Sequence, residues 1–364
     1  MRKTLYLLAM LACIGQPSSA QIITTFAGSS SSGYSGDGGA ATAAQLSQPN
    51  SLAVDTLGNV YIADAANGRV RKVNSAGIIT TIAGNGTYAY SGDGGAATNA
   101  EFMDPASIAL DKMGKLYIAD VVGNRIRIVD PLGNISTFAG NGVAGYSGDG
   151  GQATAASLNG PWFVRPDNMG NVYFSDALNQ RVRKINAAGV ITTIAGNGTE
   201  GYLGDGSAAT TAELADPTGI VLDGVGNIYI GDNNNFRIRK ISPTGIITTI
   251  AGSGVSGYSG DGGPATLAKL GYVGGLAFDN AGNLYVAAGN RIRKINTLGI
   301  ITTVVGTGSV GYSGDNGLAT AAELNGPTDV LIDSLGTMFI ADYFNSKIRK
   351  VNNPVAVPSV VLPI

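Results

Sequence analysis

A seven-residue motif, Gly-Tyr-Ser-Gly-Asp-Gly-Gly, occurs in close variants six times along this 364-residue chain. Its aspartates are Asp37, Asp93, Asp149, Asp205, Asp261 and Asp315. The first four intervals between them are 56 residues and the fifth is 54. A fixed period of this kind indicates a repeat architecture. The chain therefore contains six copies of one unit, and residues present in every copy are expected to build that unit.

Each unit contains four short apolar runs separated by turn residues. In the second unit they are 107–111, 115–119, 125–129 and 134–138. Their alternation and β-branched content predict strands. A glycine such as Gly114 ends the connection between the first two runs, where a tight hairpin needs a positive φ. Six units of four antiparallel strands predict an all-β fold, a six-bladed β-propeller.

The two ends of the array complement each other. Residues 21–27 match the fourth strand of the unit, whereas the last unit ends with its third strand at residues 347–351. We expect the N-terminal strand to join the C-terminal blade and close the ring, which leaves no blade edge unpaired. The predicted propeller spans 21–352, and 353–364 form a C-terminal tail.

Residues 1–20 have the pattern of a secretory signal peptide. Arg2 and Lys3 precede an apolar stretch, and small residues precede Gln21. The apolar stretch is too short to span a bilayer permanently. In an alternative interpretation, Cys13 is lipidated and anchors the protein in the outer envelope. We expect a secreted, periplasmic or extracellular protein without a transmembrane segment.

Composition excludes several kinds of chemistry. The chain has no histidine, and Cys13 is its only cysteine. A Ser-His-Asp triad, a cysteine nucleophile in the mature chain and a His or Cys zinc site are therefore excluded. Without Arg2 and Lys3 there are 21 basic and 25 acidic residues, a net charge of −4. Nucleic-acid binding requires a basic surface, so we expect no such partner.

At this point the sequence resembles a known family. The segments 49–64 and 67–72 carry the pattern Pro…Asp…Gly-Asn…Tyr-Ile-Ala-Asp…Asn-x-Arg-x-Arg. This is similar to the NHL repeat, and the interposed glycine-rich motif resembles bacterial secreted NHL proteins and the NHL domain of teneurins. The resemblance implies a six-bladed propeller that serves most often as an interaction platform. A minority of relatives are metal-dependent lyases or lactonases, and the lyases rely on histidines that this chain lacks.

Acidic and basic residues recur around the turn between the second and third strands. An aspartate closes the second strand and an arginine opens the third in most units. We predict structural braces between them, because pairing satisfies both charges beside the core. The alternative is a ring of ion-binding carboxylates. The predicted braces are Asp64 with Arg69, Asp120 with Arg125, Asp176 with Arg181, and Asp232 with Arg237.

The glycine-rich motif lies in the long loop before each first strand. Its aspartate is expected to fold the loop, with calcium binding as the alternative. Each loop offers one carboxylate whereas calcium takes six to eight oxygens, so we expect no cofactor. Each copy of the motif also contains a tyrosine. These tyrosines are expected either to form an aromatic rim on the loop side of the disc or to pack under their own loops. These tyrosines are Tyr34, Tyr90, Tyr146, Tyr202, Tyr258 and Tyr312.

Function is expected where the copies differ. The first strand of the third unit carries the only tryptophan, Trp162, and an isolated arginine, Arg165. The first strand of the sixth unit, across the ring, carries Asp329. We predict a ligand site at the channel mouth made by these three residues, suited to a sugar, a peptide or a small anion. The alternative is neutral drift in a decaying repeat.

The sequence thus favours a monomeric, non-catalytic secreted propeller that binds a protein or carbohydrate at the cell surface through its loop-rich face. Two alternatives stay open. One is a metal-dependent hydrolase or lyase with a site at the channel mouth. The other is a structural spacer within a cell-surface assembly.

Overall fold

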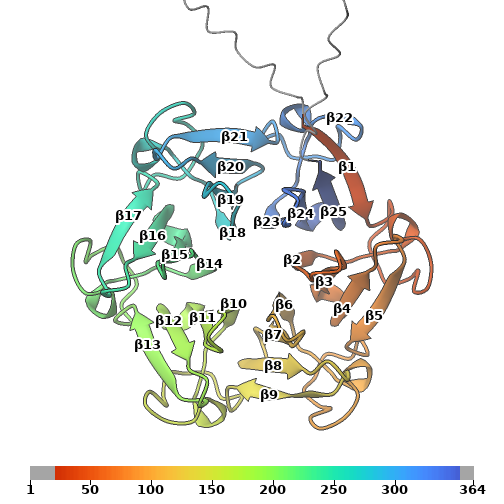
Figure 1. Ribbon diagram of the computed structural model, residues 1–364, viewed down its shortest axis with the longest axis horizontal. Helices are drawn as coiled ribbons and strands as arrows, with labels where there is room; N and C mark the ends of the chain where they lie inside the picture. The colour runs from red at the N-terminus through yellow and green to blue at the C-terminus, as the bar shows by residue number, and fades with distance from the viewer. Residues whose placement is uncertain (1–20, 353–364) are drawn as a thin grey trace, which may run out of the picture.

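The computed structural model describes residues 21–352, which form a six-bladed β-propeller around a central channel (Figure 1). Five blades are four-stranded antiparallel sheets, and the sixth sheet has five strands. In every blade the first strand lies innermost and the fourth lies at the rim. The predicted fold class is confirmed. The predicted signal peptide, the alternative lipid anchor at Cys13 and the tail at 353–364 lie outside the described residues.

The strands follow the predicted runs closely. Blade 1 contains β2 (Pro49–Val54), β3 (Val60–Asp64), β4 (Arg69–Val73) and β5 (Ile79–Ala83). Blade 2 contains β6 (Pro105–Leu110), β7 (Leu116–Asp120), β8 (Arg125–Val129) and β9 (Ile135–Ala139). Blade 3 contains β10 (Pro161–Pro166), β11 (Val172–Asp176), β12 (Arg181–Ile185) and β13 (Ile191–Ala195).

The second half of the ring repeats this order. Blade 4 contains β14 (Pro217–Leu222), β15 (Ile228–Asp232), β16 (Arg237–Ile241) and β17 (Ile247–Ala251). Blade 5 contains β18 (Val273–Phe278), β19 (Leu284–Ala288), β20 (Ile292–Ile295) and β21 (Ile301–Val305). Blade 6 contains β23 (Pro327–Ile332), β24 (Met338–Asp342), β25 (Lys347–Val351) and, from the other end of the chain, β1 (Ile22–Ala27).

The ring closes as the sequence predicts. Strand β1 runs antiparallel to β25, with Ile23 opposite Val351 and Thr24 opposite Lys350. The two-residue strand β22 (Gly317–Leu318) pairs with the other edge of β1. Both ends of the propeller therefore meet in blade 6 (Figure 1).

The hydrophobic core lies between neighbouring blades. In one cluster Ile126 and Ala139 of blade 2 pack with Phe174 and Ile191 of blade 3, and all four side chains are fully buried. Leu158, from the loop that joins these two blades, belongs to the same cluster. Each blade is thus stabilised by burying apolar surface against its neighbours in the ring.

Short 3-10 helices are the only helices in the described residues. Six lie in the long loops: η1 (Ala41–Ala43), η3 (Ala97–Asn99), η4 (Ala153–Ala155), η6 (Ala209–Thr211), η8 (Ala265–Leu267) and η9 (Ala319–Ala321). Four lie in the turns between the second and third strands: η2 (Ala65–Asn67), η5 (Ala177–Asn179), η7 (Asn233–Asn235) and η10 (Tyr343–Asn345). Since antiparallel connections alternate sides, the long loops and these turns share one face, which we call the loop-rich face.

Candidate binding site at the channel mouth

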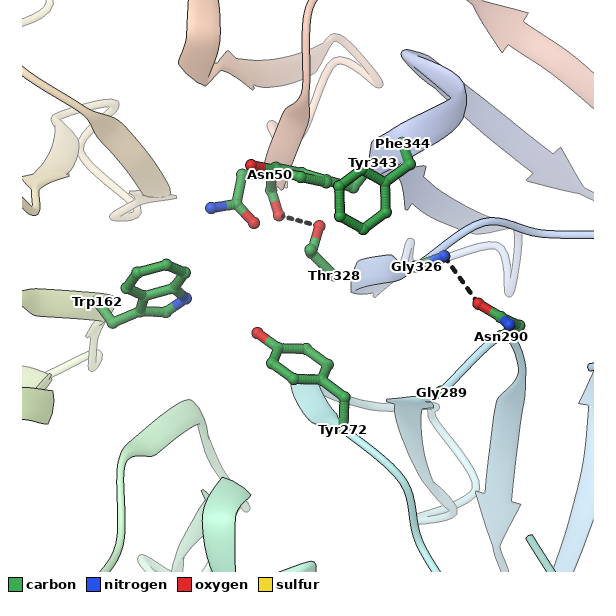
Figure 2. Close-up of a pocket in the computed structure, with 9 residues that line it drawn as sticks. All are labelled: Asn50, Trp162, Tyr272, Gly289, Asn290, Gly326, Thr328, Tyr343 and Phe344. Carbon is green, nitrogen blue, oxygen red and sulfur yellow. Dashed lines mark hydrogen bonds between the residues drawn. The ribbon is translucent and has the colours of Figure 1, made fainter. Parts of the chain in front are cut away.

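A cavity of about 420 Å³ lies at the channel mouth on the loop-rich face (Figure 2). Blades 5, 6 and 1 form most of it, and one side chain of blade 3 reaches it from across the channel. None of the lining residues carries a charge. The lining residues are Asn50, Trp162, Tyr272, Gly289, Asn290, Gly326, Thr328, Tyr343 and Phe344.

Trp162 is the contribution of blade 3. It is the second residue of β10, the innermost strand, and its side chain is partly buried. Figure 2 shows its indole nitrogen directed toward the middle of the cavity. This Nε1 atom is shielded from solvent and has no hydrogen-bond partner in the described residues. A buried indole N–H usually finds an acceptor, so this unpaired donor is an exception that needs an explanation.

Asn50 supplies a second polar atom without a partner. The residue is 4% exposed, and its Oδ1 has no hydrogen-bond partner in residues 21–352. Its backbone carbonyl accepts a hydrogen bond of 2.8 Å from the Thr328 hydroxyl, which joins blade 1 to blade 6. The backbone contact fixes Asn50, and its amide faces the cavity (Figure 2).

Blade 5 provides space because its turn is short. Four residues separate Asp64 from Arg69 in blade 1, whereas two separate Ala288 from Arg291. A side chain at Gly289 would meet nothing within 4 Å, which shows how open the site is there. The N–H of Gly289 donates to the carbonyl of Tyr272, 3.1 Å away. The shortened turn thus holds Tyr272 at the cavity wall and leaves the space beside it uncovered.

Two adjacent aromatic residues of η10 complete the site. The rings of Tyr343 and Phe344 meet edge to face with centroids 4.9 Å apart. The Tyr343 hydroxyl donates to Gln48 Oε1 at 3.2 Å. Phe344 is 62% exposed, so the cavity has an accessible apolar edge.

Of the three residues predicted for this site, Trp162 lines the cavity and the other two do not. Arg165 donates from Nε to the carbonyl of Ile220 in blade 4 at 3.3 Å. Asp329 is buried, and its Oδ2 accepts hydrogen bonds from Ser51 Oγ at 3.0 Å and Leu52 N at 2.9 Å. These contacts join the inner strands of neighbouring blades, which gives both residues a structural role beside the channel.

Charge couples these two residues. Burial raises the pKa of Asp329 to about 6, against the lowering effect of the Leu52 N–H and the Arg165 charge. Burial lowers the pKa of Arg165, and the Asp329 carboxylate partly restores it. The structure pairs no acid with Arg165 as a direct ion pair in the described residues.

The repeated braces use different arginines from those predicted. In blade 3, Asp176 lies opposite Arg181 in the sheet, but its Oδ2 pairs with Arg183 at 3.0 Å. Arg183 also pairs with the loop aspartate Asp149 at 2.7 Å. Arg181 instead donates to the carbonyls of Asn179 and Asn197, both at 2.8 Å. The second arginine of the Arg-x-Arg pattern is buried deeper in the strand, which is why it meets the buried carboxylate.

The same correction applies around the ring. Arg69, Arg125 and Arg237 also donate to backbone carbonyls, and none forms an ion pair with an aspartate in residues 21–352. Each blade instead has one fully buried arginine paired with the aspartate of its loop motif. These arginines are Arg71, Arg127, Arg183, Arg239, Arg293 and Arg349. In four blades this arginine also pairs with the strand aspartate: Asp64, Asp176, Asp232 and Asp342.

The motif tyrosines belong to these same groups of residues. The Tyr146 ring has the Arg181 guanidinium 3.7 Å from its centroid, and its hydroxyl donates to Asp149 Oδ2 at 3.0 Å. We call Tyr146, Asp149, Asp176, Arg181 and Arg183, with their equivalents in other blades, the loop clusters. All six tyrosines are partly exposed, so one side of each ring faces solvent while the other packs on its cluster.

The loop aspartates are occupied by protein donors. Asp149 binds Arg183 through Oδ1 and accepts from Tyr146 and the Thr193 N–H through Oδ2. Burial raises the pKa of Asp149, and the hydrogen bond from Thr193 and the Arg183 charge bring it below its usual value. The neighbouring 3-10 helix η4 receives no side-chain cap. Asp149 instead ties the loop to the third and fourth strands of its blade through Arg183 and Thr193.

Comparison with known proteins identifies the family. The model of the teneurin NHL domain matches residues 28–91, 85–146, 197–256 and 254–313. These matches cover more than half of the chain. The chain belongs to the teneurin NHL domain family.

Similar proteins are much longer than this one. The chain is 29% identical over 326 residues to the protein SUPPRESSOR OF QUENCHING 1 of Arabidopsis thaliana, a match covering 84% of this chain and 30% of that protein. It is 28% identical over 293 residues to mouse teneurin-1, covering 67% of this chain and 10% of teneurin-1. The match to this chain covers less than a third of either relative.

Solved structures share the fold. An auxiliary nutrient binding protein from Bacteroides thetaiotaomicron superposes with a TM-score of 0.67 at 15% identity, covering 92% of this chain and 77% of that one. A gluconolactonase from Xanthomonas campestris superposes with a TM-score of 0.53 at 15% identity, covering 84% and 86%. At such identities the likeness concerns the fold, which hosts both binding proteins and enzymes.

Two further features bear on the alternatives. Within 21–352, no group of three or more His, Cys, Asp or Glu side chains could hold a metal ion. In the same range, no helix has the length and apolarity needed to cross a bilayer.

Proposed function

We propose that this chain is a secreted, non-catalytic propeller that binds a protein or glycan partner through its loop-rich face. The observation that carries this proposal is the cavity at the channel mouth, where an uncharged aromatic lining and two unpaired polar atoms come together. Cavities of this size and lining are typical of ligand sites.

The composition supports a binding role over a catalytic one. The chain has no histidine, and the cavity lining offers neither a general base nor a carboxylate. The auxiliary nutrient binding protein, which shares this fold, agrees with a binding role. The gluconolactonase keeps a propeller hydrolase as the alternative, and a structural spacer is the other.

A pair of variants on opposite faces tests the proposal. Leu178 lies in a turn of the loop-rich face and is 62% exposed, whereas Met169 lies in a hairpin on the opposite face and is 76% exposed. We expect Leu178→Glu to abolish binding to a glycan array and to native envelope extract, because it places a charge on the loop-rich face. Met169→Glu should bind as wild type.

Two outcomes would contradict the proposal. If Met169→Glu loses binding and Leu178→Glu keeps it, the partner contacts the opposite face and the proposal is wrong. If neither wild type nor variant binds any glycan or envelope component, the structural spacer becomes the better account.

A further inference from the structure

We propose that the channel-mouth cavity binds one neutral saccharide unit, stacked on Trp162 and hydrogen-bonded to the Trp162 indole and the Asn50 amide. This inference rests on the proposed function and specifies the ligand class at the loop-rich face. Nothing in the repeat itself requires such a site, because its residues come from the places where the blades differ.

The lining combines apolar surface with hydrogen-bonding groups, and a sugar also has both an apolar face and polar hydroxyls. Trp162, Tyr272 and Phe344 supply apolar aromatic surface, which suits the C–H face of a pyranose ring. Asn50 and Thr328 supply polar groups close to that surface. The volume of about 420 Å³ suits a small ligand and leaves little room for a folded polypeptide element.

The two unpaired atoms are complementary. Trp162 Nε1 can only donate a hydrogen bond, and Asn50 Oδ1 can only accept one. A sugar hydroxyl both donates and accepts, so one or two hydroxyls satisfy both atoms. Buried polar atoms without partners cost free energy, and a ligand that pairs them removes that cost.

Charge argues against an anionic ligand. No lining residue is charged, so an anion in the cavity would lose water without gaining a cationic partner from the lining. The carboxylates of Asp216 and Asp329 are near enough to add to the burial effect that raises the pKa of Tyr272. Asp104 has the same effect on Tyr343. An anion would therefore meet negative potential at this mouth.

The single tryptophan makes the test direct. Trp162 is the only tryptophan of the full chain, so fluorescence excited at a wavelength that tyrosine does not absorb reports on this site alone. The protein is titrated with glucose, galactose, mannose, N-acetylglucosamine and their neutral disaccharides up to about 50 mM. We expect a saturable change with at least one of them. Glucuronate, tetramethylammonium and triglycine, titrated in parallel, should leave the spectrum unchanged.

Matched variants test whether the sugar binds in the channel-mouth cavity. Asn50→Ala and Phe344→Ala should weaken the sugar by about tenfold or more, measured by calorimetry. Val122→Ala is the control, because Val122 occupies the position of Phe344 in the blade 2 turn and does not line the cavity. Circular dichroism and the melting temperature check that each variant folds.

The outcomes separate this inference from the proposed function. It is overturned if no neutral sugar changes the Trp162 fluorescence, if tetramethylammonium, glucuronate or triglycine binds instead, or if Asn50→Ala and Phe344→Ala bind as Val122→Ala does. In each of these cases the proposed function survives as long as Leu178→Glu still abolishes partner binding. Loss of that face dependence overturns the proposed function itself.

Discussion

The loop clusters and the channel mouth differ in how their polar groups are paired, although Arg183 Nε in the blade 3 cluster also lacks a partner in the described residues. In the blade 3 cluster, the carboxylates of Asp149 and Asp176 share the buried guanidinium of Arg183. At the channel mouth, Trp162 Nε1 and Asn50 Oδ1 have no partner in the described residues. The six clusters repeat around the ring, whereas the mouth is built from differences between blades. Residues that recur therefore complete the fold, whereas among the residues that differ Trp162 lines the cavity, and Arg165 and Asp329 join neighbouring blades.

The largest effect is expected from breaking a loop cluster. Arg183→Met leaves two carboxylates beside the core without their cation, and removing one partner of a buried ion pair costs about 3–5 kcal/mol. Denaturant unfolding should show this loss. The control is Arg181→Met, since Arg181 donates to backbone carbonyls, packs on the Tyr146 ring and forms no ion pair in the described residues. Equal losses in the two variants would contradict the assignment of the brace to Arg183.

A moderate effect is expected from the loop aspartate. Asp149→Asn keeps the shape of the side chain but removes the charge that pairs with Arg183, and the pair is partly exposed. We expect a loss of about 1 kcal/mol, reduced by solvent screening, with faster proteolysis of the 140–158 loop. Thermal melts with and without added calcium complete the test. A calcium-dependent gain in wild type that disappears in Asp149→Asn would show that the loops hold calcium.

A further effect depends on pH. Burial, together with the neighbouring Asp120 charge, raises the pKa of Asp104 to about 6. A carboxyl whose pKa is raised by folding binds its proton more tightly in the native state, so its ionisation destabilises the fold as pH rises from about 4 through 6.

Asp104→Asn should therefore gain stability over wild type at neutral pH and little at about pH 4. Urea unfolding at both pH values measures the difference. A gain that stays constant across this range would show that Asp104 has an ordinary pKa. Unlike the clusters, Asp104 makes no ion pair in residues 21–352, which is why its charge carries a cost.

The architecture could be predicted from the sequence because the repeat is long and regular. The spacing of Asp37, Asp93 and their successors gave six blades, and the unmatched strand at residues 21–27 gave the closure between β1 and β25. It also pointed to Trp162 as a departure from the repeat. It did not identify the arginine partner, because Arg181 and Arg183 lie on the same face of one strand and the depth of burial depends on the loop above them.

What the sequence determined by itself was therefore the fold, since short-range alternation and a fixed period specify strands and their order. Only the tertiary structure decided which arginine each aspartate binds and which side chains meet at the mouth. Asn50, Trp162, Tyr272 and Phe344 come from four different blades, and although Asn50 and Trp162 occupy the same position of the repeat, no common spacing links all four. Ring closure brings them together, and a shortened turn in blade 5 leaves the space between them open.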